Sequence, residues 1–399
     1  MQISFFEDHL LPRFHPLTLT RPIDDLRVGI GTISEKWQAR FNPSGTARLL
    51  RNDLQGVFSQ GEINSSEPCL WINSRYVPKK SLVEQINDLE VGSCLKSGDV
   101  VIAAKVEGEK SREWLDNGST DFNTLLVLET EEFTPIRYLW DLFKMNGEEI
   151  RADIERFEIS TSRNHSISPD VMFENREQIF IEEGVKIEPG AILIANDGPI
   201  YIGPNATVSA GAIIKGPVAV CEKATINMGA RISNATTIGP VCKAGGEINN
   251  SIFHSYSNKG HEGFVGNSLI GQWCNFGADT NTSNLKNNYS TIRITDWKSM
   301  QQIETDQQFI GTIMGDHSKT AINVQLNTGT VCGVSCNIFT SDFPPKFISS
   351  FTWVGTNVMQ PYKFDKAVET MKAVMKRRDV EMTEEYEKLM KKLSDRSRN

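Results

Sequence analysis

One histidine in this sequence stands where acid–base chemistry is possible. His261 lies in the stretch GHEGFVG, with Gly260 before it and Gly263 two residues after it. An imidazole titrates close to neutral pH and can take a proton from a reacting group. The structural alternative is a solvated residue at a turn. The surrounding pattern decides which elements could position this side chain.

A periodic array surrounds the histidine. From about residue 179 the chain repeats in blocks of six, such as VSAGAI, IKGPVA and INMGAR, and each block opens with an aliphatic residue. Small residues recur at the fifth position, as at Ala206, Ala212 and Ala224. This hexapeptide pattern predicts a left-handed parallel β-helix. The first residue of each block then points inward, and small residues fit the tight corners.

The array is interrupted at two places. It loosens in NNSIFHSYSNKG, directly before His261, and it loops out over residues 281–309 before it resumes. Interruptions in a solenoid become loops on one face, and such faces commonly bind ligands.

Three parts are expected along the chain. Before the array, apolar runs such as CLWIN and DVVIAAKV read as strands and alternate with helical segments such as SLVEQINDL, which is typical of an α/β domain. After the array, two segments have an amphipathic helical pattern. We therefore predict an α/β domain at 1–165, a β-helix at 175–355 and C-terminal helices over 362–399.

The composition narrows the class of protein. A formal net charge of −8 argues against nonspecific binding to nucleic acid or to anionic membranes. We find no pattern of a signal peptide and no apolar run long enough to span a bilayer. Seven cysteines include one close pair, Cys332 and Cys336, with no second pair for a zinc site. We expect a cytoplasmic protein with reduced thiols and no bound metal.

The order of these parts resembles that of the bifunctional sugar nucleotidyltransferase–acetyltransferases, the N-acetylglucosamine-1-phosphate uridyltransferase-like family. The segments PLTLTRP, YLWDLFKMNGEEI, GHEGFVG, TSNLKNNY and GDHSKTAIN look like those of a divergent bacterial subgroup. Those enzymes acetylate glucosamine 1-phosphate with acetyl-CoA and then couple it to UTP. The resemblance implies acetyl-CoA as co-substrate, a sugar phosphate or nucleotide-sugar as substrate, and a homotrimer.

The β-helical half carries the closest similarity. The run HEGFVGNSLIGQWCNFGADTNTSN matches the family pattern without a gap and places His261, Asn275, Ala278 and Asn284 on functional positions. The resemblance implies that His261 is the general base on the amino group of the acceptor sugar. Asn275 and Asn284 would orient the sugar or the acetyl carbonyl. A backbone N–H near Ala278 would polarise the thioester oxygen.

This half also departs from the family. Phe264 replaces a tyrosine, and Asn249 falls where the family has a lysine that binds the sugar phosphate. Four basic residues are the remaining candidates for phosphate or CoA contacts: Arg231, Lys286, Arg293 and Lys319.

The N-terminal half keeps PLTLTRP but has lost the rest of the nucleotidyltransferase signature. EDHLLPRF replaces the glycine loop that cradles the phosphates, and Ile23 stands in place of the signature lysine. Ser74 and Arg75 occupy the position of the Gly-Asp that binds magnesium. An arginine cannot ligate Mg²⁺, so ordinary UTP-dependent transfer requires Asp24, Asp25 or another carboxylate as a substitute. Possible phosphate-binding residues in this half are Arg13, Thr18, Arg21 and Arg27.

Three functions remain open from the sequence. The first is a CoA-dependent N-acetyltransferase that acts on an amino-sugar phosphate or nucleotide-sugar. The second is a sugar-1-phosphate nucleotidyltransferase with an atypical active site. The third is a non-catalytic nucleotide-sugar-binding or scaffold protein that keeps the shape of both halves.

Overall fold

The computed structural model describes residues 1–131 and 133–397 and separates into two compact units. The first comprises Met1–Leu11, Thr20–Leu26 and Gly31–Arg137, and the second comprises Pro12–Leu19, Arg27–Ile30 and the chain from Tyr138 onward. The boundary expected near residue 165 does not coincide with this division, because the helix after Arg137 packs with the solenoid.

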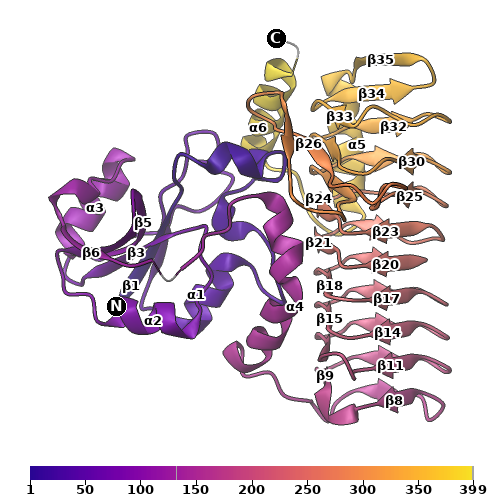
Figure 1. Ribbon diagram of the computed structural model, residues 1–399, viewed down its shortest axis with the longest axis horizontal. Helices are drawn as coiled ribbons and strands as arrows, with labels where there is room; N and C mark the ends of the chain where they lie inside the picture. The colour runs from indigo at the N-terminus through magenta and orange to yellow at the C-terminus, as the bar shows by residue number, and fades with distance from the viewer. Residues whose placement is uncertain (132, 398–399) are drawn as a thin grey trace. The chain divides into compact units, whose positions relative to one another are not determined.

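The first unit is built on one mixed sheet in the order β2-β1-β3-β5-β4-β6 (Figure 1). Its strands are β1 (Gln2–Phe6), β2 (Thr46–Arg48), β3 (Cys69–Asn73), β4 (Ser93–Ser97), β5 (Val100–Val106) and β6 (Leu126–Glu129). Its helices are α1 (Ile33–Phe41), α2 (Lys80–Asn87) and α3 (Gly108–Asn117). β1 pairs in parallel with β2 and β3, whereas β5 is antiparallel to β3. Every residue of β1 and β3 is buried, as expected for near-continuous apolar strands.

The second unit contains a parallel β-solenoid whose coils stack three sheets (Figure 1). The first solenoid sheet consists of β7 (Ser166–Ile167), β10 (Lys186–Ile187), β13 (Thr207–Val208), β16 (Thr225–Ile226), β19 (Lys243–Ala244) and β22 (Asn258–Lys259). The second consists of β8 (Met172–Glu174), β11 (Ile192–Ile194), β14 (Ile213–Lys215), β17 (Arg231–Ser233), β20 (Glu247–Asn249) and β23 (Phe264–Gly266). The third consists of β9 (Ile179–Ile181), β12 (Ile200–Ile202), β15 (Val218–Val220), β18 (Thr236–Ile238), β21 (Ile252–Ser255), β24 (Leu269–Gln272), β28 (Thr312–Met314), β31 (Thr330–Cys332) and β33 (Phe347–Ile348).

The final coils continue this pattern with additions. Their further strands are β25 (Asn281–Thr282), β26 (Arg293–Thr295), β27 (Gln302–Glu304), β29 (Lys319–Thr320), β30 (Gln325–Leu326), β32 (Asn337–Phe339), β34 (Thr352–Gly355) and β35 (Val358–Pro361). The antiparallel pair β26–β27 is formed by the segment that interrupts the hexapeptide repeat, so this interruption contains a hairpin.

The hexapeptide pattern correctly predicts the interior of the solenoid. The aliphatic residues that open the blocks, such as Ile202, Val208 and Ile226, are completely buried in one continuous core. The small residues Ala206 and Ala212 are equally buried. Because each coil buries its apolar side chains only against its neighbours, the stack is held together by the same contacts repeated along its length.

Helices complete the second unit. The predicted helix before the array is α4 (Leu139–Arg156), which lies beside β15 and β18 and donates a hydrogen bond from Asn146 Nδ2 to Thr237 Oγ1 at 3.0 Å. The predicted C-terminal helices are α5 (Phe364–Lys376) and α6 (Glu384–Arg396), and the last two residues of the predicted range lie outside the described residues. The predicted fold class, an α/β domain followed by a hexapeptide β-helix and helices, is confirmed. No helix in the described part of the chain is long and apolar enough to cross a membrane.

Candidate functional site

His261 projects from a corner of the solenoid, in the four residues 260–263 that join β22 to β23. Its side chain is exposed, and no hydrogen-bond or ionic partner for it is found among the described residues. The two other histidines of the solenoid are engaged: His254 Nδ1 lies 3.0 Å from Ser255 Oγ, and His317 Nε2 lies 3.0 Å from Tyr386 Oη. Of these three imidazoles, His261 is the one that is available to a ligand.

A buried lysine supports this corner from inside the solenoid. Lys259 is completely buried, and its ammonium donates hydrogen bonds to the carbonyl oxygens of His261 and, at 2.8 Å, Glu262. The small Ala244, which pairs with Lys259 in the coil below, leaves room for the long side chain. Burial lowers the pKa of Lys259 to about 8. Sequence reasoning missed this residue, although a lysine at an inward position of a hexapeptide array was the signal that could have revealed it.

Adjacent coils fix the rest of the corner backbone. The carbonyl of Gly260 accepts a hydrogen bond from Asn227 Nδ2 at 2.7 Å, and the carbonyl of Gly263 accepts one from the Glu247 N–H at 3.1 Å. With the two bonds from Lys259, all four carbonyl groups of residues 260–263 have a partner. The corner is therefore rigid, and a side chain that projects from it has a defined starting position.

The corner directly below His261 is unusually short. Two residues, Gly245 and Gly246, join β19 to β20, whereas four residues join β16 to β17 and four join β22 to β23. Gly246 has a φ of +68°, and a Cβ there would lie 2.8 Å from the His261 carbonyl oxygen. Only glycine fits this close approach. The shorter corner thus brings the backbone of one coil close to the His261 corner of the next.

Directly above His261 lies Ala278. The Asp279 N–H donates to the Glu262 carbonyl at 2.9 Å, which aligns the two coils and places Ala278 over His261. The Ala278 carbonyl accepts from the Asn323 N–H at 2.8 Å, but no acceptor for the Ala278 N–H is found among the described residues. A backbone N–H without an acceptor is the kind of group that can stabilise a developing oxyanion.

Phe264 and Asn284 meet on the side of the corner formed by the second solenoid sheet. A Cβ on Gly266 would lie 2.5 Å from Phe264 Cζ and 2.7 Å from Asn284 Nδ2, so both side chains cover this glycine. Asn284 Nδ2 donates to Asn267 Oδ1 at 2.8 Å, which orients the amide. Asn249 lies one coil below, paired with Gly266, and its amide donates to Ser233 Oγ at 3.2 Å.

Asn275 and Lys319 lie on the other side of the corner. Asn275 stands between Asn258 and Lys319 in the ladder of the first solenoid sheet. Both Asn275 and Lys319 line a cavity beside α5. The two predicted asparagines therefore lie on different sides of the corner: Asn284 lies beside Phe264, and Asn275 lies beside Lys319.

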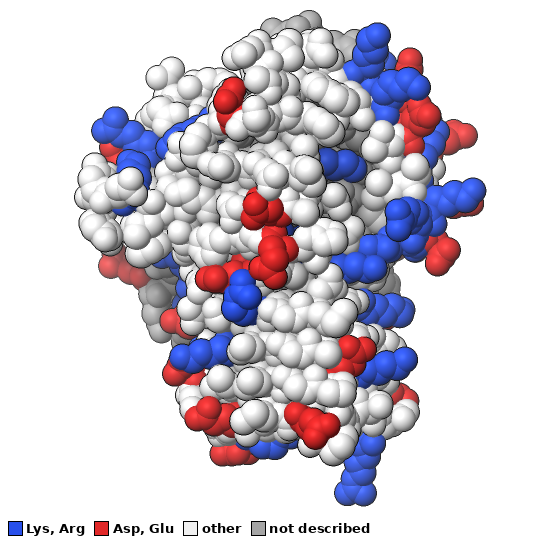
Figure 2. All heavy atoms as spheres, turned by 90° about the vertical axis from the view of Figure 1, so that its right-hand side faces the viewer, with Lys and Arg blue, Asp and Glu red and all other residues white. Residues whose placement is uncertain are grey.

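The other predicted cations are engaged with neighbouring groups. Arg231 Nη2 lies 3.3 Å from a carboxylate oxygen of Glu262. Arg293 is paired with Glu304, and Lys286 Nζ donates to the Thr291 carbonyl at 2.6 Å. Arg231 and Arg293 are exposed, so a ligand would have to compete with their carboxylates. Figure 2 shows basic side chains along one margin of the solenoid face, with acidic side chains among them.

In the first unit, an ion pair occupies the edge where parallel strands end. Arg75 follows β3 and is completely buried, and its Nε lies 2.9 Å from Asp8 Oδ2 after β1. Asn73 Nδ2 donates to the same carboxylate at 3.1 Å. Burial opposes ionisation of Asp8, but the hydrogen bond and charge of Arg75 hold its pKa below the ordinary value. This edge is where ligands bind in open α/β sheets, and here the chain's own cation holds the carboxylate.

The four possible phosphate-binding residues of the N-terminal half are divided between the two units. Arg21 belongs to the first unit and is paired with Asp25 at 3.3 Å. The other three belong to the second unit: Arg13 lies over the ring of Tyr138, and Thr18 Oγ1 lies 2.9 Å from His15 Nδ1. Arg27 donates to the carbonyls of His254 and Ile30 and is buried. Because backbone carbonyls already accept its hydrogen bonds, Arg27 is not suited to hold a phosphate.

No group of three or more histidine, cysteine or acidic side chains that could hold a metal ion occurs in the described ranges.

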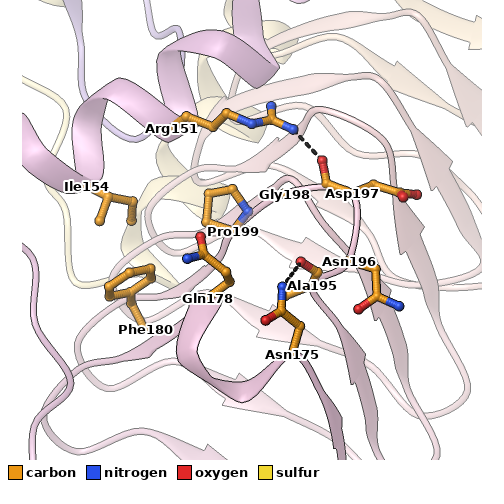
Figure 3. Close-up of a pocket in the computed structure, with 10 residues that line it drawn as sticks. All are labelled: Arg151, Ile154, Asn175, Gln178, Phe180, Ala195, Asn196, Asp197, Gly198 and Pro199. Carbon is orange, nitrogen blue, oxygen red and sulfur yellow. Dashed lines mark hydrogen bonds between the residues drawn. The ribbon is translucent and has the colours of Figure 1, made fainter.

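A cavity of about 500 Å³ lies at the first coils, lined by residues from α4 and the solenoid (Figure 3). Two of its polar side chains bond to its own backbone: Arg151 donates to the Asp197 carbonyl, and Asn175 Nδ2 donates to the Ala195 carbonyl at 3.0 Å.

Parts of this chain resemble known proteins. Residues 3–161 match the family model described as sugar nucleotidyl transferase. The chain is 33% identical over 188 residues to the bifunctional protein GlmU of Methanocaldococcus jannaschii, which is 47% of this chain and 42% of that protein. It is 36% identical over 89 residues to GlmU of Methanococcus vannielii, which is 22% of this chain and 20% of that protein. The chain thus spans less than half the length of these curated relatives.

Solved structures give weaker likenesses. A UDP-N-acetylglucosamine acyltransferase from Campylobacter jejuni matches with a TM-score of 0.22 and 14% identity over 57% of this chain and 95% of that chain. The Arabidopsis enzyme of the same name matches with a TM-score of 0.22 and 10% identity over 55% of this chain and 79% of that chain.

The chain therefore combines a segment that resembles sugar nucleotidyl transferases with a hexapeptide β-solenoid. Over the aligned residues the chain is GlmU-like.

Proposed function

We propose that this protein is a CoA-dependent N-acetyltransferase that acts on an amino-sugar phosphate or nucleotide-sugar, with His261 as the general base. The observation that carries the proposal is the combination at one rigid corner of an available imidazole and, one coil above, an Ala278 N–H without an acceptor. One group accepts a proton and the other donates a hydrogen bond, as acyl transfer requires. The similarity to bifunctional GlmU proteins supports the same chemistry.

In the proposed reaction the His261 imidazole removes a proton from the amino group of the sugar while that nitrogen attacks the carbonyl carbon of the acetyl thioester. The new C–N bond forms and the C–S bond breaks. The Ala278 N–H stabilises the oxyanion during attack. The CoA thiolate leaves and takes up a proton, which the imidazolium can return. No covalent acyl-enzyme is involved.

The side chains around the corner receive roles that fit their positions. Phe264 offers a flat apolar surface to a sugar ring, and the amide of Asn284, oriented by Asn267, can bond a sugar hydroxyl. We propose that a homotrimer brings a second copy of the chain against this corner. The N-terminal domain acts in this proposal without nucleotidyl transfer, because Arg75 holds the carboxylate of Asp8 at the strand edge.

The direct test is His261→Ala, assayed by CoA thiol release from acetyl-CoA with glucosamine 1-phosphate and with UDP-glucosamine. Removal of a general base lowers kcat by about 10²–10⁴-fold. His9→Ala is a matched control, since His9 is exposed in the first unit. Both variants should keep the wild-type oligomer in light scattering. Full activity of His261→Ala would eliminate the proposed base.

A further inference from the structure

A basic cavity of about 350 Å³ lies between the first solenoid sheet and the end of α5. Ten residues line it: Lys243, Tyr256, Asn258, Trp273, Cys274, Asn275, Lys319, Val374, Arg377 and Arg378. Four of them are cations, and none is a carboxylate. We name this site the α5 cavity.

The cations of the α5 cavity are not neutralised. No ion-pair partner for Lys243, Lys319, Arg377 or Arg378 is found in the described part of the chain. Arg378 Nη2 donates to Asn258 Oδ1 at 3.0 Å, but its Nε is buried without an acceptor. Elsewhere on the solenoid Arg231 and Arg293 have carboxylate partners. A buried, unsatisfied N–H costs free energy, so this cluster is incomplete without an anion.

Lys319, like Arg378, would be stabilised by a bound anion. Its ammonium donates to the His317 carbonyl at 2.8 Å, and burial lowers its pKa to about 8. A neighbouring negative charge would stabilise the protonated form and raise that pKa. A phosphate group suits such a cluster, because arginine and lysine both donate strong charge-assisted hydrogen bonds to its oxygens.

An aromatic surface adjoins the cations. Tyr256 stacks on Trp273 with 4.2 Å between the ring centroids and an interplanar angle of 19°. Trp273 is nearly buried, whereas Tyr256 is partly exposed, and both residues line the cavity. A planar base can stack on such a ring, and base–aromatic stacking is tolerant of the base's identity.

We propose that the α5 cavity binds a nucleotide, with its phosphate at Lys319, Arg377 and Arg378 and its base on Tyr256. The cavity is a binding site separate from the base and the oxyanion donor at the His261 corner. The free nucleotide and the nucleotide end of CoA share this chemistry. The proposal does not depend on His261 being a catalytic residue.

The test is isothermal titration calorimetry of the full chain with AMP, adenosine and inorganic phosphate. We expect AMP to bind at least about tenfold more tightly than either fragment, since it combines the charged contacts with stacking. Arg378→Gln should weaken AMP binding about tenfold. Lys376→Gln, the matched control on an exposed α5 lysine that does not line the cavity, should leave it unchanged. Tyr256→Ser should weaken AMP but not phosphate.

Several outcomes would overturn the proposal. One is AMP binding no tighter than adenosine, and another is AMP binding that survives Arg377→Gln/Arg378→Gln in a chain whose melting temperature matches the wild type. Competition between CoA and AMP would support CoA as the source of the nucleotide, and AMP binding unaffected by CoA would support a free nucleotide. His261→Ala should bind AMP normally, which separates this site from the proposed catalytic base.

Discussion

The ammonium of Lys259 lies inside the solenoid and donates a hydrogen bond to the carbonyl oxygen of His261, whose own side chain faces solvent. A buried charge and an exposed imidazole are thus two residues apart and joined through one peptide group. Burying a charge costs free energy unless hydrogen bonds satisfy it. The hydrogen bonds to the carbonyl groups of this corner therefore stabilise the buried lysine and the corner backbone together.

Lys259→Met should therefore reduce catalysis without removing the base. The variant keeps an apolar stem inside the solenoid but releases the His261 carbonyl. Under the proposed function, kcat should fall at least about tenfold because a poorly positioned base lowers the rate, with a smaller change in KM. Hydrogen exchange at residues 260–263 should become faster. Lys186→Met, on an exposed lysine of the same sheet, is the control. Unchanged kcat and exchange would show that Lys259 does not position His261.

The same lysine predicts a pH dependence of stability. Burial lowers its pKa from the ordinary 10.5 to about 8. Between these two values Lys259 keeps a proton in the unfolded chain that it releases in the folded chain, so its own contribution to stability rises with pH across this window. Each such group contributes a slope of up to about 1.4 kcal/mol per pH unit.

Chemical denaturation between about pH 8 and 9.5, below the ordinary tyrosine range, measures this slope. Lys319 shifts in the same direction, whereas burial raises the pKa of thiols such as those of Cys242 and Cys274, which contribute slopes of the opposite sign. The contribution of Lys259 is therefore the difference in slope between the wild type and the variant. Lys259→Met should reduce the slope and leave the contribution of Lys319. An identical slope in the variant would mean that Lys259 keeps an ordinary pKa.

Gly266→Ala tests the surface formed by Phe264 and Asn284. The new Cβ would lie 2.5 Å from the ring and 2.7 Å from the amide, so at least one of them must move. If these side chains orient the acceptor, kcat/KM should drop at least about tenfold. Gly45→Ala, whose Cβ would meet nothing closer than 3.7 Å, should leave kcat/KM unchanged. Wild-type kcat/KM in the Gly266 variant would remove Phe264 and Asn284 from the acceptor site.

The N-terminal domain should not catalyse nucleotidyl transfer. With UTP, Mg²⁺ and a panel of hexose 1-phosphates, the full chain should release no pyrophosphate above background. The physical reason is that Arg75 binds the carboxylate of Asp8 at the edge of the sheet. Mg²⁺ prefers oxygen ligands, and the guanidinium of Arg75 is a cation that cannot serve as one. A time-dependent release that requires Mg²⁺ would favour the second function left open by the sequence.

The repetitive part of this structure could be predicted from the sequence because the spacing of residues close together in the chain determines it. Ile202, Val208 and Ile226 recur at the spacing of a coil, and each takes the inward position that the pattern assigns. The strand runs CLWIN and DVVIAAKV likewise match β3 and β5. Where a local repeat determines which side chains are buried, the sequence is enough to predict the strands and the core.

The candidate site was less accessible because its contacts join distant residues. Nothing in the run that contains Asn275 and Asn284 indicates that the two amides lie on opposite sides of a corner. The pairing of Asp8 with Arg75 depends on two strands brought together by the sheet. Residues 27–30 join the second unit through contacts such as Arg27 with His254, which no periodicity predicts.

The two-glycine connection between β19 and β20 has a wider consequence. Its brevity brings the backbone of Gly246 close to the His261 carbonyl, and this approach depends on the length of the link and on the absence of a side chain. Lengthening this link to the usual four residues would change the backbone that supports His261 while leaving every proposed contact residue in place. The recognition properties of such an edge can thus be altered by an insertion that no comparison of its functional residues would reveal.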